Sequence, residues 1–133
     1  MPAFVFDNDN QTFTINGSAT VTIHEIKNVS YNEDYGLCGF HIPCEIGATF
    51  SVLMGSYTYS SNHDVADCCR DGICSAETVE VAMFDTDGNW ITPNMDDDVI
   101  GYVDAEQFVQ LLLMTNNMNL AKQIDSGIKE LGA

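Results

Sequence analysis

The sequence predicts an α+β fold in which an antiparallel β-sheet, formed by the first two thirds of the chain, carries two helices from the end of the chain. Short apolar runs with a period of two fill the first part of the chain, and Asn-Gly and Asp-Gly turn signals separate several of them. The last part has the apolar spacing of helices. The 133 residues, 45% of them hydrophobic, can supply one core, so a single domain over residues 1–133 is expected.

The first elements are expected to be a hairpin and a third strand. Residues 3–6 and 12–15 are short Phe-containing runs, and the Asp and Asn residues between them favour a turn. After an Asn-Gly turn signal, residues 19–23 alternate between apolar and polar, which is typical of a strand with one buried face. Residues 27–36 lack such a pattern and are predicted to be a loop.

Two further strands are expected later in the chain. Residues 48–59 place three apolar side chains on one face, and Gly55 is a candidate bulge before two tyrosines. Residues 78–84 form the next strand, and the Asp-Gly pair that follows predicts a second hairpin with residues 89–92.

Two helices are predicted to close the chain. Asp104 is expected to cap the first, whose buried stripe is formed by Phe108, Leu111, Leu112 and Thr115. Asn117 or Asn119 starts the second, whose buried face is Leu120, Ile124, Ile128 and Leu131. A third, short helix over residues 64–71 would turn Cys68 and Cys69 inward.

The charge of the chain is strongly unbalanced. Twenty residues are Asp or Glu and only 4 are Lys or Arg, which gives a formal net charge of −16. From residue 107 onward acids and lysines cancel, so the net charge lies in residues 1–106. Such a field steers a protein towards basic partners, at the cost of self-repulsion. The shortage of cations argues against direct binding of nucleic acid, because phosphate contacts supply most non-specific affinity.

Cysteine and histidine residues are the candidates for a metal centre. A Cys-x2-His-x2-Cys run begins at Cys38, and a histidine and three more cysteines follow between residues 63 and 74. Thiolate and imidazole ligands from two short loops are the usual way to hold structural zinc. However, the adjacent Cys68 and Cys69 would point apart on a helix, so buried reduced thiols are preferred and no cofactor is expected. The zinc candidates are Cys38, His41, Cys44, His63 and Cys74.

Other chemistry finds little support in the sequence. The Asp-rich segments after Asp7 and Asp85 begin like calcium loops, but neither has Gly at the sixth and Glu at the twelfth position, so both are interpreted as turns. The chain lacks the Gly-x-Ser-x-Gly, Walker and dinucleotide glycine motifs, so no enzyme is expected. It also lacks a long apolar stretch and a basic, apolar leader, so the expected compartment is the cytoplasm and no membrane contact is expected.

The acidic residues come in small groups at expected loops and turns. Spaced carboxylates can imitate duplex DNA, which carries about one charge per 1.7 Å of helix axis. They could therefore occupy the Lys/Arg groove of a nucleic-acid-binding protein. The equally weighted alternative is that they are solvated acids that keep the protein soluble. The groups are Asp7 and Asp9; Glu33 and Asp34; Asp64, Asp67 and Asp71; Asp85 and Asp87; Asp96, Asp97 and Asp98; and Asp104 and Glu106.

In size, charge and lack of catalytic motifs, the chain resembles the small acidic anti-defence proteins of phages and plasmids, the DNA-mimic antirestriction and anti-CRISPR proteins. Residues 84–120 also resemble, more loosely, the C-terminal part of the ArdB/KlcA antirestriction family. The shared order is an Asp- and Gly-rich turn, an aromatic strand at residues 89–93, Gly101, Asp104 and a Leu-rich helix. The resemblance implies an inhibitor that acts in the cytoplasm of the host cell.

These observations lead to the expectation of a non-catalytic inhibitor that binds a basic groove of a host defence complex, either a CRISPR effector or a restriction enzyme. The candidate partner-binding residues are Asp85, Asp87, Asp96, Asp97, Asp98, Asp104 and Glu106. Two alternatives stay open. A viral structural or assembly protein would make homotypic contacts through tyrosines such as Tyr57 and Tyr59, and a zinc-stabilised domain or metal-dependent enzyme would use the Cys/His segments. The sequence leaves the oligomeric state open.

Overall fold

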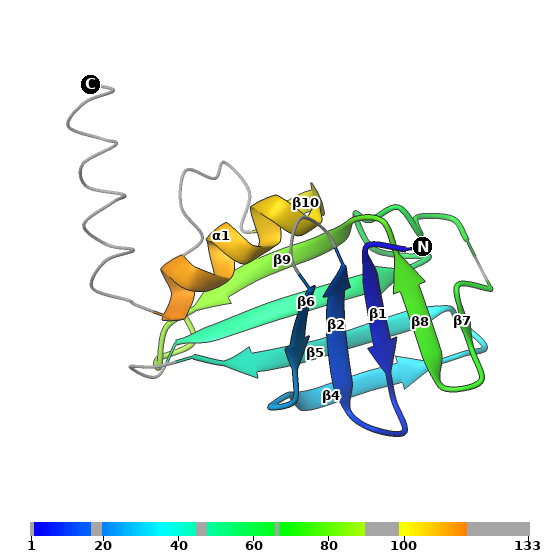
Figure 1. The fold of residues 1–133 in the computed structure, drawn as a ribbon, viewed down its shortest axis with the longest axis horizontal. Helices are drawn as coiled ribbons and strands as arrows, with labels where there is room; N and C mark the ends of the chain where they lie inside the picture. The colour runs from blue at the N-terminus through cyan, green and yellow to red at the C-terminus, as the bar shows by residue number, and fades with distance from the viewer. Residues whose placement is uncertain (1, 17–19, 45–47, 66, 90–98, 117–133) are drawn as a thin grey trace.

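The strands form two antiparallel sheets that pack face to face in a computed structural model, which describes residues 2–16, 20–44, 48–65, 67–89 and 99–116. The first sheet has the order β3-β2-β1-β8-β7, and the second has the order β10-β9-β6-β5-β4. The strands of the first sheet run across those of the second (Figure 1). The antiparallel β-structure predicted for the first part of the chain is confirmed, but it is divided between two sheets rather than one.

The first sheet contains the hairpin predicted at the start of the chain. Its strands are β1 (Phe4–Asp7), β2 (Thr12–Asn16), β3 (Thr20–Ile23), β7 (Cys69–Arg70) and β8 (Ile73–Ala76). Phe4 and Phe6 alternate with half-buried residues along β1, as the period of two predicts. The strand that pairs with the other side of β1 is β8, which comes from much later in the chain.

The second sheet includes three strands that the sequence pattern missed. Its strands are β4 (Lys27–Asn32), β5 (Leu37–Pro43), β6 (Thr49–Gly55), β9 (Val79–Phe84) and β10 (Ile100–Val103). The prediction of a loop over residues 27–36 was wrong for residues 27–32, which form the edge strand β4, whereas residues 33–36 form a turn. The strand predicted for residues 48–59 ends at Gly55, so Tyr57 and Tyr59 lie in the turns that follow.

Aromatic rings fill the space between the sheets. Phe4 and Phe13 from the first sheet stack with a centroid distance of 5.6 Å. Phe13 also lies 4.9 Å from Phe40 of the second sheet. Phe108 packs against Phe4 at 5.3 Å and against Phe50 of the second sheet at 5.0 Å. These contacts join elements from both sheets and from the end of the chain into one core.

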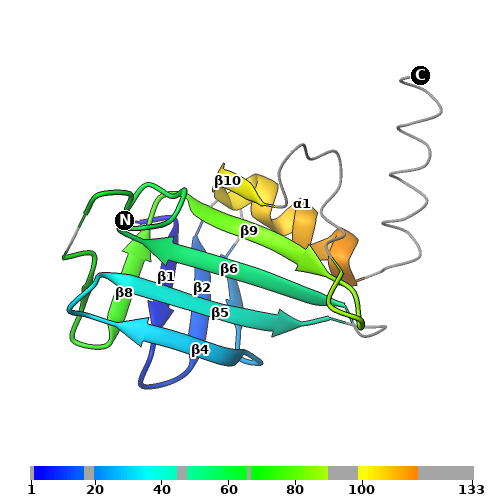
Figure 2. The ribbon, with the colours of Figure 1, turned by 180° about the vertical axis from the view of Figure 1, so that it is seen from behind.

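One helix, α1 (Ala105–Asn116), lies within the described residues, beside β9 and β10 (Figure 2). Its predicted N-cap is confirmed, because the Gln107 amide donates a hydrogen bond of 2.9 Å to Asp104 Oδ1. The helix predicted from Asn117 or Asn119 onward lies outside the described residues. The short helix predicted over residues 64–71 was wrong, since residues 69 and 70 form β7 and Asp64 and Asp71 have positive φ angles of 64° and 55°.

Replacing Phe108 by Ala should lower the free energy of unfolding by about 3–5 kcal/mol, because the change leaves a cavity where α1 meets both sheets. Equilibrium denaturation in urea measures this loss. Leu113→Ala on the same helix is the matched control, since Leu113 is 63% exposed and its truncation should change stability by less than about 0.5 kcal/mol. Equal unfolding midpoints for the two variants would contradict the packing described for Phe108.

Candidate functional site

The structure separates the acidic residues that the sequence singled out for partner binding. Asp85 and Asp87 lie in the turn after β9, whereas Asp104 and Glu106 lie at the start of α1. Val103 pairs with Val79, at the opposite end of β9 from that turn. A strand of six residues spans about 17 Å, so these two pairs do not form one patch. Asp96, Asp97 and Asp98 lie outside the described residues.

Two of these acids have structural roles. Asp85 Oδ1 accepts hydrogen bonds from the amides of Asp87 and Asn89 at 3.0 and 2.9 Å, which closes the turn after β9. Asp104 caps α1 in the same way. Interpreting residues 85–89 as a turn rather than a calcium loop therefore agrees with the hydrogen bonds.

A different group of acids lies together at one end of the sandwich, where three turns meet. The β1–β2 and β7–β8 turns are joined by a hydrogen bond of 2.7 Å from the Asn8 amide to the Gly72 carbonyl. The Gly72 amide in turn donates a hydrogen bond of 2.9 Å to Glu33 Oε1 in the β4–β5 turn. We call this surface the acidic end. It consists of Asp7, Asp9, Glu33, Asp34 and Asp71.

Glycine is required where these turns meet. Gly72 has a φ of +82°, in the left-handed region that side chains with a Cβ rarely adopt. A Cβ at this position would also lie 3.2 Å from Asp9 Oδ2. The close approach of the Asp9 carboxylate to the backbone of Gly72 therefore brings the β1–β2 and β7–β8 turns into contact.

Hydrogen bonds hold two carboxylates of the acidic end in the ionised state. The side chain and amide of Asn10 donate to Asp7 and lower its pKa. The Gly72 amide and the Tyr31 hydroxyl donate to Glu33 and lower its pKa. These two groups therefore stay charged further into the acid range than free carboxyl groups do.

Cations near the acidic end are scarce. Lys27 and Arg70 are the only Lys or Arg residues in the part of the chain that the structure describes. Arg70 forms an exposed ion pair with Asp67, with an N–O distance of 3.7 Å. Lys27 begins β4, about 17 Å along the strand from the turn that holds Glu33. Most of the negative charge at this end is therefore uncompensated by the protein itself.

The exposed tyrosines form two pairs, of which one lies at the β4–β5 turn of the acidic end and the other lies towards the opposite edge of the second sheet. Tyr57 is 77% exposed, and its neighbour Ser56 donates a hydrogen bond of 2.7 Å to the carbonyl of the exposed Tyr35. Tyr59 and Tyr102 form a second pair, because the Tyr102 amide donates to the Tyr59 carbonyl at 2.8 Å. Tyrosine supplies contact area at low entropic cost and is common in protein interfaces.

Four of the five cysteines come together at the same end of the sandwich. The Sγ atoms of Cys68, Cys69 and Cys74 all lie within 4.8 Å of one another. The buried Cys38 on β5 lies beside them, close enough to raise the pKa of the Cys74 thiol. Cys68 and Cys69 do not point apart, because the helix that would have separated them is absent and their Sγ atoms are 3.9 Å apart.

The other zinc candidates lie outside this group. His41 is three positions after Cys38 on β5, so its side chain is on the opposite face of the sheet, where Nδ1 lies 3.1 Å from Asn28 Nδ2. His63 Nδ1 lies 2.9 Å from the Thr58 carbonyl oxygen. We call Cys38, Cys68, Cys69 and Cys74 the thiol cluster. Two of its members, Cys38 and Cys74, are among the five zinc candidates predicted from the sequence, and the other two are not.

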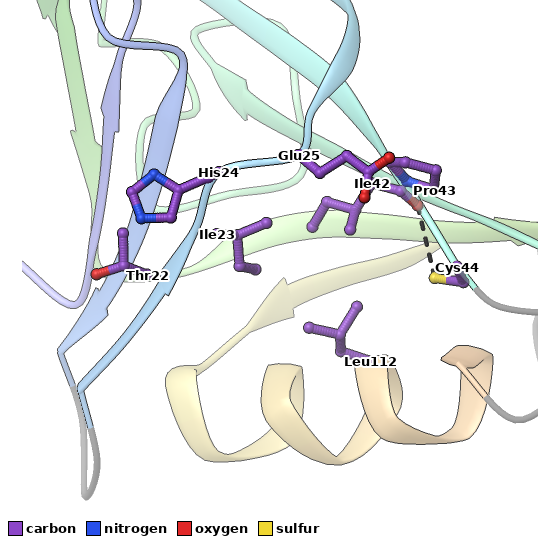
Figure 3. Close-up of a pocket in the computed structure, with 8 residues that line it drawn as sticks. All are labelled: Thr22, Ile23, His24, Glu25, Ile42, Pro43, Cys44 and Leu112. Carbon is purple, nitrogen blue, oxygen red and sulfur yellow. Dashed lines mark hydrogen bonds between the residues drawn. The ribbon is translucent and has the colours of Figure 1, made fainter.

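Cys44 lies in a separate groove of about 480 Å³ between the end of β3, the end of β5 and α1 (Figure 3). Its thiol donates a hydrogen bond of 3.5 Å to the Ile42 carbonyl, and burial raises its pKa to about 11. A thiol of this kind is protonated at neutral pH and is a poor nucleophile. His24 lies at the other end of the groove, with the apolar side chains of Ile23 and Leu112 between (Figure 3).

The hydrogen bonds of Glu33 predict a specific dependence of stability on pH. Because folding lowers the pKa of Glu33, its contribution is complete above the ordinary carboxyl value of about 4.3 and is lost as the pH falls through the lower folded value. Glu33→Gln should therefore be less stable than the wild type at pH 7, and the difference should shrink towards pH 3. Urea unfolding across this range measures it.

Asp34→Asn is the matched control for this prediction, since it removes one exposed charge from the same turn. Its effect on stability should vary less with pH than that of Glu33→Gln. A stability difference between wild type and Glu33→Gln that stays constant from pH 7 to pH 3 would contradict the role given to the Glu33 carboxylate.

Comparison of the chain with protein-family models, curated protein sequences and solved structures finds no match. No helix in the described part of the chain is long and apolar enough to span a membrane.

Proposed function

We propose that the chain is a non-catalytic binding protein whose acidic end occupies a basic, nucleic-acid-binding groove of another protein. The observation that carries this proposal is the meeting of three acidic turns at Gly72, which gathers five carboxylates from distant parts of the sequence. The expected target is a host defence complex, a CRISPR effector or a restriction enzyme, and the expected compartment is the cytoplasm of the host cell. Inhibition would follow from exclusion of the nucleic acid.

The fixed positions of the carboxylates favour this function. The carboxylates of Asp7 and Glu33 are held by backbone amides, and Asp9 lies against Gly72. A surface that is organised before binding loses less conformational freedom when a partner docks. Its uncompensated charge also accelerates encounter with a basic partner, and this steering weakens as salt is added.

The neighbouring tyrosines add a second mode of contact with a basic groove. Arginine side chains pair with carboxylates and also lie over aromatic rings, in an interaction worth about 0.5–1 kcal/mol at exposed sites. Tyr35 follows Glu33 and Asp34 in the same turn and is 62% exposed. A groove lined with arginine would therefore find both carboxylates and aromatic rings to contact on this surface.

A viral structural or assembly role is the second candidate function, and the exposed tyrosines favour it as well. Tyr57, Tyr59 and Tyr102 are all more than half exposed. In a homotypic assembly these side chains would be buried between copies of the chain. Light scattering after size exclusion tests this role, because it requires a defined oligomer that persists in high salt and is weakened by Tyr57→Ser.

The acidic-end proposal predicts that the location of the charge matters as well as its amount. Replacing Asp9, Asp34 and Asp71 by Asn should abolish capture of a nucleic-acid-handling complex from bacterial lysate, because the change removes three exposed charges of the acidic end. Wild-type protein should retain the complex at low salt and release it at about 1 M salt, where the Debye length falls to about 3 Å. Mass spectrometry identifies the captured proteins, and added duplex DNA or RNA should compete with capture.

The matched control replaces Asp96, Asp97 and Asp98 by Asn, which removes the same number of charges from the group that the sequence favoured. This variant should still capture the complex. If it loses the complex while the acidic-end variant keeps it, the binding surface is the sequence-predicted group instead. If both variants capture the complex equally weakly, the total charge matters and its location does not, which would contradict the acidic-end proposal.

A further inference from the structure

The thiol cluster has the dimensions of a metal centre. In a tetrahedral zinc–thiolate site the Zn–S bonds are about 2.3 Å, which places the sulfur atoms about 3.8 Å apart. The Sγ atoms of Cys68 and Cys69 are 3.9 Å apart, and those of Cys68, Cys69 and Cys74 all lie within 4.8 Å. Movements of less than about 1 Å would therefore bring these three sulfur atoms to the spacing that zinc requires.

The fourth ligand comes from the opposite sheet. Cys38 on β5 is fully buried, and it lies close enough to Cys74 on β8 to raise the pKa of the Cys74 thiol. The four cysteines thus come from both sheets and from the segment that leads into β7. We propose that Cys38, Cys68, Cys69 and Cys74 bind one zinc ion, which joins the two sheets of the sandwich.

The surroundings of the cluster fit a structural rather than a catalytic zinc site. Cys69 and Cys74 are 4% and 0% exposed, so the ion would be closed off from solvent by protein atoms. Nδ2 of the buried Asn62 lies 4.0 Å from Cys74 Sγ and donates a second hydrogen bond of 2.8 Å to the Ser75 carbonyl. An amide held in this way beside the sulfur is the kind of outer contact that stabilises a metal-bound thiolate.

The proposal is tested on the full chain, purified under reducing conditions without chelator, with elemental analysis and cobalt substitution as readouts. The expected result is about one zinc per chain, and a cobalt form whose spectrum shows thiolate charge transfer and the intense visible bands of tetrahedral coordination. Cys69→Ser and Cys74→Ser should lose both signals. Cys44→Ser is the matched control and should keep both, because Cys44 lies in the separate groove.

A second measurement covers the case in which the buried cysteine variants fail to fold. Removal of metal from the wild-type protein with a chelator should lower its melting temperature, because zinc that binds only the folded state stabilises that state. Added zinc, but not added magnesium, should restore the melting temperature. Five titratable thiols with no bound zinc and no cobalt–thiolate spectrum would overturn the proposal. So would a Cys69–Cys74 disulfide in freshly prepared protein, since these two residues are partners across β7 and β8. None of these readouts requires the partner of the acidic end.

Discussion

Two hydrogen bonds of Gly72 fix the β7–β8 hairpin between turns from both sheets. Its amide donates to Glu33 of the second sheet, and its carbonyl accepts from Asn8 of the first. The hairpin carries Cys69 and Cys74 on its strands and Asp71 at its tip. Both the acidic end and the thiol cluster therefore depend on the position of this one turn, and a residue with a Cβ at Gly72 would be strained at the φ of +82° and would crowd Asp9.

The acidic end combines two opposing effects. Carboxylates gathered around a single arginine, Arg70, repel one another, which lowers the stability of the compact state. The amides that donate to Asp7 and Glu33 offset part of this repulsion, since a hydrogen bond to an ionised group is stronger than one between neutral groups. The same bonds hold the charges in fixed positions. A partner with a basic surface would relieve the remaining repulsion. Binding of such a partner would therefore favour the same positions of the carboxylates that folding produces.

Local patterns in the sequence predicted the elements that depend on neighbouring residues. The β1–β2 hairpin and the Asp104 cap were predicted because turn residues and capping residues act within a few positions. The edge strand β4 was missed because four of its six residues are polar, so that only Val29 and Tyr31 carry the period of two. The helix at residues 64–71 was wrong because its apolar spacing was outweighed by the left-handed backbone at Asp64 and Asp71 and by pairing with β8.

The site could be predicted only in part, because its members meet through long-range pairing. The sequence identified each acidic group of the acidic end, but nothing local indicates that residues 7–9, 33–34 and 71 share one surface. Their proximity follows from the order of strands, in which β8 lies beside β1. The thiol cluster was discounted for a related reason: the wrong helix separated Cys68 from Cys69, whereas the structure brings their sulfur atoms together.

The hydrogen bond between Gly72 and Glu33 can be observed directly by following the Gly72 amide proton in an NMR titration from pH 7 to pH 2. A proton bonded to a carboxylate changes its chemical shift when that carboxylate is protonated. The structure predicts a large change in the chemical shift of the Gly72 amide proton, with a midpoint below the ordinary carboxyl pKa of about 4.3, because the hydrogen bond lowers the pKa of Glu33. In Glu33→Gln this pH-dependent change should be absent. An amide resonance that does not respond to pH in the wild type, or that responds equally in the variant, would contradict the meeting of the turns at Gly72.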